Sequence, residues 1–164
     1  MNLIFRMFLT IFFAKRAAPL NPLDISRVTM RVLPNDLDVQ MHMNNGRFLS
    51  IMDLGRIDLM VRTGFWAVAK QNGWFPLVGS VKIDYRRTLA VFEKFEMTSQ
   101  IISWDDRWIF MEQQLISGGK MAAKATFKTM IRGKNGLVKP TEVMMATGVD
   151  LVSPALSSDA NALL

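Results

Sequence analysis

The chain has 164 residues, of which 50% are hydrophobic, so it is large enough to bury a substantial core as one domain. It contains no cysteine and one histidine. This composition excludes a disulfide framework and thiolate chemistry and argues against a structural zinc site, so we expect no metal. The net charge of +6 favours anionic partners such as phosphates. No ladder of interleaved aromatic and basic residues accompanies that charge, so we expect no nucleic acid among the partners.

Residues 1–22 are predicted to form an apolar helix and a linker. The segment LIFRMFLTIFF is apolar apart from Arg6, and Lys15 and Arg16 follow it. It is shorter than the roughly 20 apolar residues of a spanning helix, and its charges follow the apolar run, unlike those of a cleavable signal peptide. Two interpretations remain open. The helix packs on the domain or on a second copy, or it contacts a membrane surface through residues 1–16.

Residues 23–152 are predicted to form the main domain, which begins with a strand and a long helix. Apolar and β-branched residues predict a strand at 26–33. A broad apolar stripe at helical spacing predicts a long helix over residues 46–62. Gly55 weakens that helix by about 1 kcal/mol relative to alanine. Its presence therefore predicts a sheet that crosses close to the helix.

The rest of the domain reads as a short helix and a run of strands. The helix covers residues 65–72 and ends at Gly73. Strands separated by Asp, Gly and Asn turn residues then follow at 77–86, 91–104, 107–117 and 120–132. One strand, a long helix and an antiparallel meander make an α+β order. The tail, residues 153–164, is predicted to be disordered.

The stretch LPNDLDVQMHMNNGRF at residues 33–48 carries the densest set of chemical groups. Its polar residues include Asp36, Asp38, His42, Asn44 and Asn45. Asparagine is a preferred N-cap residue, and the free N–H groups at a helix start favour negative charge held nearby. From the residues alone, the two acids either carry chemistry or cap the helix and pair with Arg31 or Arg47.

The string DLDVQMHMNNGRF resembles the D-x-D-x-x-G-H-x-N-N-x-x-Y signature of the 4-hydroxybenzoyl-CoA thioesterase-like branch of the hotdog-fold superfamily. SWDDRW at residues 103–108 is similar to the corresponding string of thioesterase superfamily member six-like proteins. The resemblance implies an α+β hotdog fold, a long central helix wrapped by a curved antiparallel sheet. It implies a homodimer or a dimer of dimers. It also implies hydrolysis of an acyl-CoA or acyl-carrier thioester without a cofactor, coenzyme A being part of the substrate.

The resemblance assigns catalytic roles within the motif. Asp38 falls on the catalytic carboxylate and acts either as nucleophile or as general base. Backbone N–H groups near Asn45 and Gly46 polarise the thioester carbonyl. His42 either orients Asp38 and its loop or acts as a base.

The chain departs from the signature at three positions. The replacements are Met41 for Gly, Met43 for a β-branched residue and Phe48 for Tyr. Met41 lacks the backbone freedom of glycine, and Phe48 lacks the tyrosine hydroxyl. These changes favour an apolar acyl chain as the group bound.

A further set of residues is predicted to contact substrate: Asn44, Gly46, Phe48, Asp36, Arg86, Lys120 and Lys124. Lys120 and Lys124 belong to a row of cations on one face of the last long strand, which can bind the phosphates of coenzyme A. The alternative for this row is a solvated face that discourages edge-to-edge aggregation.

A second function class remains open, a non-catalytic acyl-binding or lipid-binding module at a membrane surface. The methionine substitutions in the motif, Met41 and Met43, and the apolar N-terminal segment favour it, since flexible thioethers suit an acyl-lined interior. We expect a cytoplasmic location, with membrane association through residues 1–16 as the alternative.

Overall fold

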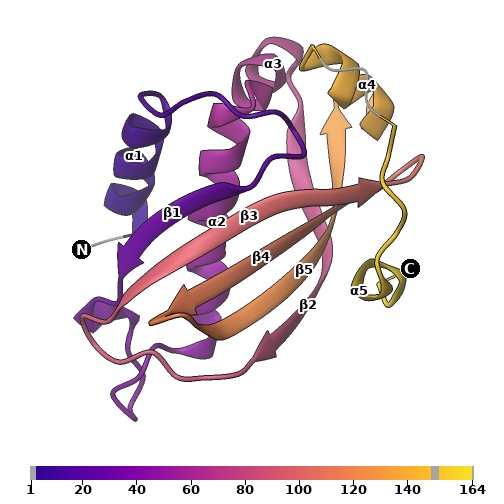
Figure 1. The fold of residues 1–164 in the computed structure, drawn as a ribbon. Helices are drawn as coiled ribbons and strands as arrows, with labels where there is room; N and C mark the ends of the chain where they lie inside the picture. Colours follow the sequence, from indigo (N-terminus) through magenta and orange to yellow (C-terminus); the bar gives the residue numbers. More distant parts are fainter. Residues whose placement is uncertain (1–2, 149–151, 164) are drawn as a thin grey trace.

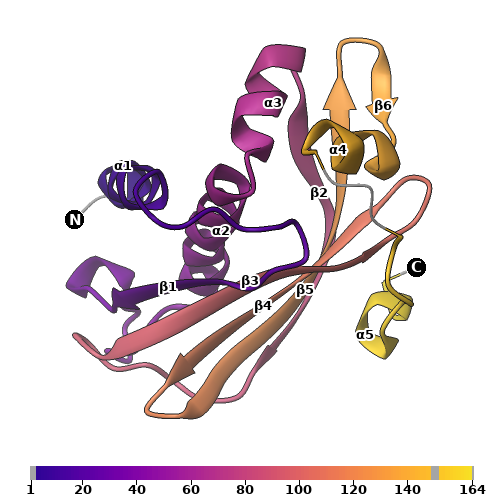
Figure 2. The same cartoon turned by 45° about the horizontal axis from the view of Figure 1, so that its top comes forward.

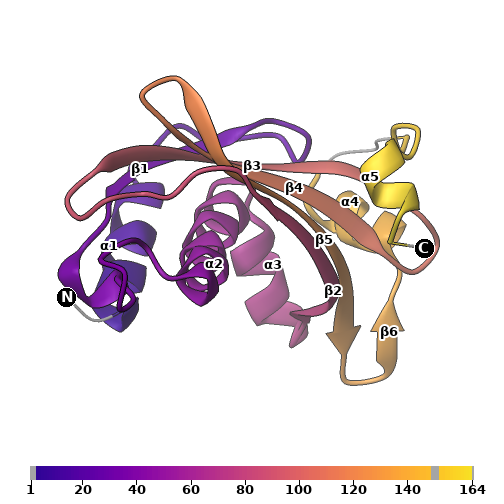
Figure 3. The same ribbon diagram turned by 90° about the horizontal axis from the view of Figure 1, so that it is seen from below.

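The computed structural model describes residues 3–148 and 152–163. Its elements run in the order α1 (Leu3–Ala14), β1 (Ser26–Arg31), the 3-10 turn η1 (Pro34–Asp36), α2 (Asn45–Arg62), α3 (Phe65–Asn72), β2 (Phe75–Tyr85), β3 (Lys94–Trp104), β4 (Ile109–Ser117), β5 (Lys120–Gly133), β6 (Gly136–Val138), α4 (Pro140–Ala146) and α5 (Ser158–Asn161) (Figure 1). The long helix α2 lies in the hollow of a strongly curved sheet (Figure 3).

The sheet is antiparallel throughout, with the strand order β1-β3-β4-β5-β2. Strands β3, β4 and β5 form a meander, and β2 pairs with β5 at the edge opposite β1. The short strand β6 pairs with the end of β5 and leads into α4 (Figure 2). One antiparallel sheet curled around one long helix confirms the predicted α+β hotdog architecture.

The contact between α2 and the sheet explains Gly55. A Cβ atom at this position would lie 2.6 Å from Ser99 Oγ and 2.8 Å from both Met97 Cε and Gln113 Nε2. No side chain fits in that space without a shift of its neighbours, so the predicted close crossing of sheet over helix is confirmed. The buried face of α2, which includes Phe48, Ile51, Met52 and Leu59, packs into the same core.

The predicted helices and strands are present, with boundaries that differ by up to three residues. The largest difference is the start of β3, predicted at residue 91 and observed at Lys94. Phe92 has a φ of 62°, and the Glu93 N–H donates to Ala90 O at 3.1 Å. This turn ends the loop after β2 and prevents an earlier start of the strand.

Helix α1 packs against α2, which agrees with the first of the two interpretations given above for this segment. Its inner face buries Arg6, Thr10 and Ala14. Its outer face exposes Phe5, Phe8, Phe12 and Phe13, which are 47–62% accessible. In the ranges 3–148 and 152–163, no helix combines the length and apolarity needed to cross a membrane.

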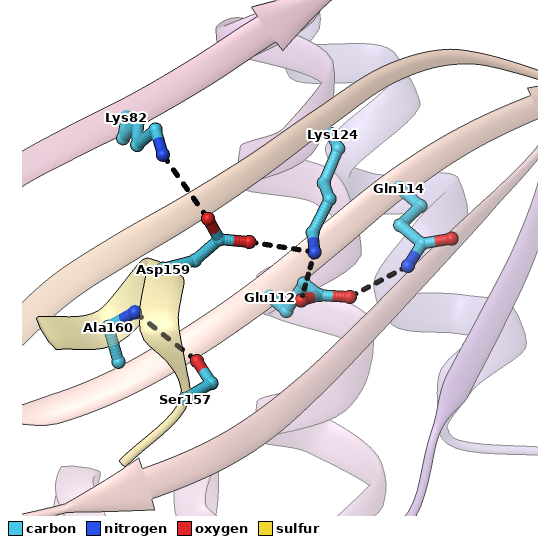
Figure 4. A network of polar contacts seen from close by, with 7 residues as sticks. All are labelled: Lys82, Glu112, Gln114, Lys124, Ser157, Asp159 and Ala160. Carbon is cyan, nitrogen blue, oxygen red and sulfur yellow. Dashed lines mark hydrogen bonds and ion pairs between the residues drawn. The ribbon is translucent and has the colours of Figure 1, made fainter. Parts of the chain in front are cut away.

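The tail differs from the predicted disorder. Residues 152–163 lie on the outer face of the sheet, where α5 contacts β5 (Figure 3). Asp159 forms ion pairs with Lys82 Nζ at 3.2 Å and Lys124 Nζ at 2.9 Å (Figure 4). Ala160 is fully buried. Lysines of two strands thus fix this segment, a tertiary effect that its polar composition did not reveal.

Candidate functional site

The motif folds into a hairpin that leads directly into α2. The Asn44 N–H donates to Asp36 O at 2.8 Å, and the Asp38 N–H donates to His42 O at 2.9 Å. Leu37 and Met43 form a bridge between these two pairs. Asp38 and His42 therefore lie opposite each other, and His42 precedes Asn45, the first residue of α2, by three residues, about 10 Å at about 3.3 Å per strand residue.

Asp36 has a structural role, contrary to the predicted contact with substrate. Its side chain is fully buried and forms ion pairs with Arg6 at 2.9 Å and with Arg47 at 3.3 Å. It also accepts a hydrogen bond from the Leu33 N–H at 2.9 Å. Arg6 in turn donates to Arg31 O at 2.8 Å. The pairing with Arg47 was one predicted alternative, whereas the partner in α1 was not anticipated.

Asp38 differs from Asp36 in both exposure and partners. Its Oδ1 accepts hydrogen bonds from the Gln40 N–H at 2.9 Å and the His42 N–H at 3.5 Å. Its side chain is partly exposed, and its Oδ2 has no partner among the residues that the structure describes. One oxygen is thus fixed by the backbone of the loop, and the other remains open to solvent or a ligand.

The start of α2 is capped by Asn44. The side chain of Asn44 caps the helix by accepting from the Gly46 N–H at 2.8 Å, and the Arg47 N–H donates to Asn44 O at 2.9 Å. Within the described residues, the N–H of Asn45 has no acceptor. Of the two backbone N–H groups predicted as oxyanion donors, only that of Asn45 is available, because the cap already uses the N–H of Gly46.

Tyr85 joins this site although the sequence did not point to it. Its hydroxyl donates to Asn45 O at 3.0 Å, and its ring meets that of Phe48 edge-on, with centroids 5.4 Å apart. Burial raises the pKa of Tyr85, which keeps the hydroxyl protonated as a donor. Phe48 is itself 2% exposed and packs in the core, contrary to its predicted contact with substrate. The one signal for Tyr85 was that it is the only tyrosine of the chain.

Met41 occupies a backbone conformation that favours glycine, with a φ of 60°. Left-handed backbone costs a residue other than glycine about 1–2 kcal/mol. A change to glycine removes this strain, but it also increases the conformational entropy of the unfolded chain, which offsets part of the gain in stability. We expect Met41→Gly to raise the free energy of unfolding by about 0.5–1 kcal/mol, measured by urea denaturation. The matched control is Val39→Gly in the same loop, which is expected to lower it by a similar amount. Equal losses in both variants would contradict the strain at Met41.

An apolar cavity of 410 Å³ lies between α2 and the concave face of the sheet. The methionines among its lining residues are Met7, Met60, Met111 and Met144. Arg56 also lines it, donates to Gln113 at 2.8 Å, pairs with Asp53, and lies over the ring of Phe127. Burial lowers the pKa of Arg56, an effect that Asp53 opposes. Asp38, His42 and Asn45 do not line this cavity.

The predicted phosphate ligands have different surroundings. Arg86 and Lys120 are exposed. Lys124 is engaged by Asp159 and by Glu112, each at 2.9 Å, and these hydrogen bonds raise the pKa of Lys124 (Figure 4). Among the described residues, no three His, Asp or Glu side chains are grouped so as to hold a metal ion. Of the predicted phosphate ligands, two are thus exposed, and the third is already paired within the chain.

Residues 32–146 match the family model of the thioesterase-like superfamily. Protein THEM6 of Danio rerio is 39% identical over 87 residues, which are 53% of this chain and 43% of that protein. Protein THEM6 of Drosophila melanogaster is 33% identical over 105 residues, 62% and 54% of the two chains. The chain thus spans about half the length of these curated relatives.

A probable thioesterase of Escherichia coli, YbaW, has a similar fold, with a TM-score of 0.69 and 19% identity. The match covers 74% of this chain and 94% of that chain. At this identity the likeness concerns the fold, which agrees with the sheet and helix described above. The family match extends over more than half of the chain and includes the hairpin and the start of α2. The chain therefore belongs to the thioesterase-like superfamily.

Proposed function

We propose that this chain hydrolyses acyl thioesters, of coenzyme A or of an acyl carrier, to a free acid and a thiol. The observation that carries the proposal is a partly exposed carboxylate in the hairpin that leads into α2, together with a backbone N–H without a described acceptor at the start of that helix. Asp38 presents Oδ2, and Asn45 presents an N–H without an acceptor within the described residues. Thioester hydrolysis needs a base or nucleophile and a donor for the developing oxyanion, and these two groups supply them.

The reaction follows one of two routes at Asp38. As a nucleophile, the carboxylate attacks the thioester carbonyl, the thiolate leaves, and water hydrolyses the resulting anhydride. As a general base, the carboxylate takes a proton from water, which attacks the same carbon. In both routes the carbonyl oxygen gains negative charge, which the Asn45 N–H and the helix dipole stabilise. The backbone N–H of His42, opposite Asp38 in the hairpin, donates to Asp38 Oδ1 at 3.5 Å and so helps to orient the carboxylate.

The acyl group is proposed to be a long apolar chain. The cavity begins at Asp53, eight residues along α2 from Asn45, which is about 12 Å at about 1.5 Å per residue. A short acyl group attached at the helix start cannot reach it. The apolar lining and its methionines suit a flexible hydrocarbon chain.

A second copy is proposed to pair along β2. This edge strand has 11 residues and exposes apolar side chains, including Phe75, Val78 and Val81. Long exposed apolar edges favour pairing with another strand. Sedimentation equilibrium should show a dimer for the wild type and a shift towards monomer for Val81→Lys. A wild-type monomer at micromolar concentration would rule out this interface.

A non-catalytic acyl-binding module at a membrane surface is the second candidate. Two observations favour it: the cavity is not lined by Asp38 or Asn45, and α1 exposes phenylalanines next to Lys15 and Arg16. Such a helix suits the interface of an anionic membrane. Co-sedimentation with anionic vesicles, lost on Phe8→Ala plus Phe13→Ala, tests this contact. Equal sedimentation of both proteins would exclude α1 as the anchor.

Thiol release from acyl-CoAs of increasing chain length tests the proposed function. We expect turnover that rises with chain length once the acyl group reaches the cavity. Binding of long acyl-CoA without thiol release from any substrate would reject hydrolysis and leave the binding module as the function.

A further inference from the structure

The end of β2 is tied to the start of α2 by one side chain. Tyr85 is the last residue of β2, and its hydroxyl donates to the backbone carbonyl of Asn45, the first residue of α2. Phe48, buried one turn further along α2, packs edge-on against the ring of Tyr85. Tyr85 remains 41% exposed, so the tie between β2 and α2 lies near the surface of the chain.

We propose that Tyr85 is a positioning residue that holds the oxyanion-donor end of α2. The inference rests on the proposed thioester hydrolysis. The hydrogen bond fixes the peptide that follows Asn45, and the proposed donor is the N–H on the other side of the same residue. Helix ends fray, and a tether from the sheet opposes that motion at Asn45.

The tether also connects the site to the edge of the sheet. Tyr85 pairs with Ala123 of β5 on one side only, because β2 is the edge strand. A second copy that pairs along β2 would hold the backbone of Tyr85 from the other side. Dimerisation would then stabilise the geometry of the donor, so that activity depends on the dimer.

Tyr85→Phe isolates the hydroxyl, because it keeps the ring and its contact with Phe48. We expect kcat to fall about 10- to 100-fold with KM within about twofold, since a misplaced donor acts on the transition state. Ser50→Ala is the matched control: it removes a hydroxyl that donates to Gly46 O in the same turn of α2 and should retain kcat within about twofold. If the wild type hydrolyses acyl-CoA and Tyr85→Phe has the same kcat, the inference about Tyr85 is wrong, whereas the proposed function still holds.

A spectroscopic test is independent of activity. Because the chain has one tyrosine, growth on 3-fluorotyrosine labels position 85 alone and gives one ¹⁹F resonance. We expect its phenol to ionise above the pKa of free 3-fluorotyrosine, and a non-hydrolysable thioether analogue of acyl-CoA to shift the resonance. If the wild type releases no thiol, the proposed function fails. The titration then still tests whether the Tyr85 hydroxyl is held by Asn45. A phenol that ionises as in free solution overturns the tether.

Discussion

Asp38→Asn is expected to lower kcat for thioester hydrolysis by about 10²–10⁴-fold, the range that a general acid or base contributes. An amide is neither a base nor a nucleophile at neutral pH, so both routes at this residue stop. The variant should still fold, because its side-chain oxygen can accept the same hydrogen bonds from Gln40 and His42. Thiol release and thermal unfolding, measured on the same preparation, separate lost chemistry from lost structure.

Asp106→Asn provides the matched control for this result. Asp106 is an exposed carboxylate in the turn between β3 and β4, outside the motif hairpin. Its kcat should stay within about twofold of the wild type. If Asp38→Asn keeps more than about a tenth of the wild-type kcat, Asp38 is not the group that attacks or activates water.

Asp36→Asn is expected to lower the free energy of unfolding by about 3–5 kcal/mol, although the residue lies only two positions from Asp38. The change leaves the guanidinium of Arg6, 6% exposed, without its buried counter-charge. It also weakens the contact with Arg47, so α1, the hairpin and α2 lose their common partner. Urea denaturation measures the loss.

A double-mutant cycle with Arg6 isolates the ion pair. Because an apolar pair of similar volume often replaces a buried ion pair without cost, Arg6→Met with Asp36→Leu should recover part of the stability that Asp36→Leu loses alone, while the contact with Arg47 stays lost. Additive losses in the double variant would show that the two residues do not interact. An Asp36→Asn protein that unfolds at the wild-type urea concentration would remove the ion pair from the account of stability.

The sequence predicted the helices and strands because their signals are local. Period-two alternation predicted β5, and the observed burial follows it in part: Ala123, Ala125 and Phe127 are buried and Lys124 and Lys128 are half-buried, but Thr126 between these lysines is buried as well. The two turn glycines after β4 have positive φ values, as their pair predicted. The tail was the exception, since ion pairs from distant strands and not its own composition hold it in place.

The candidate site was predicted in part. Asn44 caps α2 as predicted, because the preference of asparagine for that position depends on neighbouring residues only. Residue types alone could not divide the roles of the two motif acids, since both suit a helix start; only the resemblance assigned the catalytic role to Asp38. The structure distinguishes the two acids, because Arg6 of α1 forms an ion pair with Asp36, which is buried, whereas Asp38 is partly exposed.

By itself the sequence determined the α+β order, the cap of α2 and the close crossing at Gly55, because each follows from periodicity, turn chemistry or the space that one residue type requires. Only the tertiary structure decided which acid is buried, which backbone N–H remains free, where the apolar cavity opens, and that Tyr85 reaches Asn45 across 40 residues of chain. These features depend on side chains brought together by the curvature of the sheet around α2, and the spacing of residues along the chain does not encode that curvature.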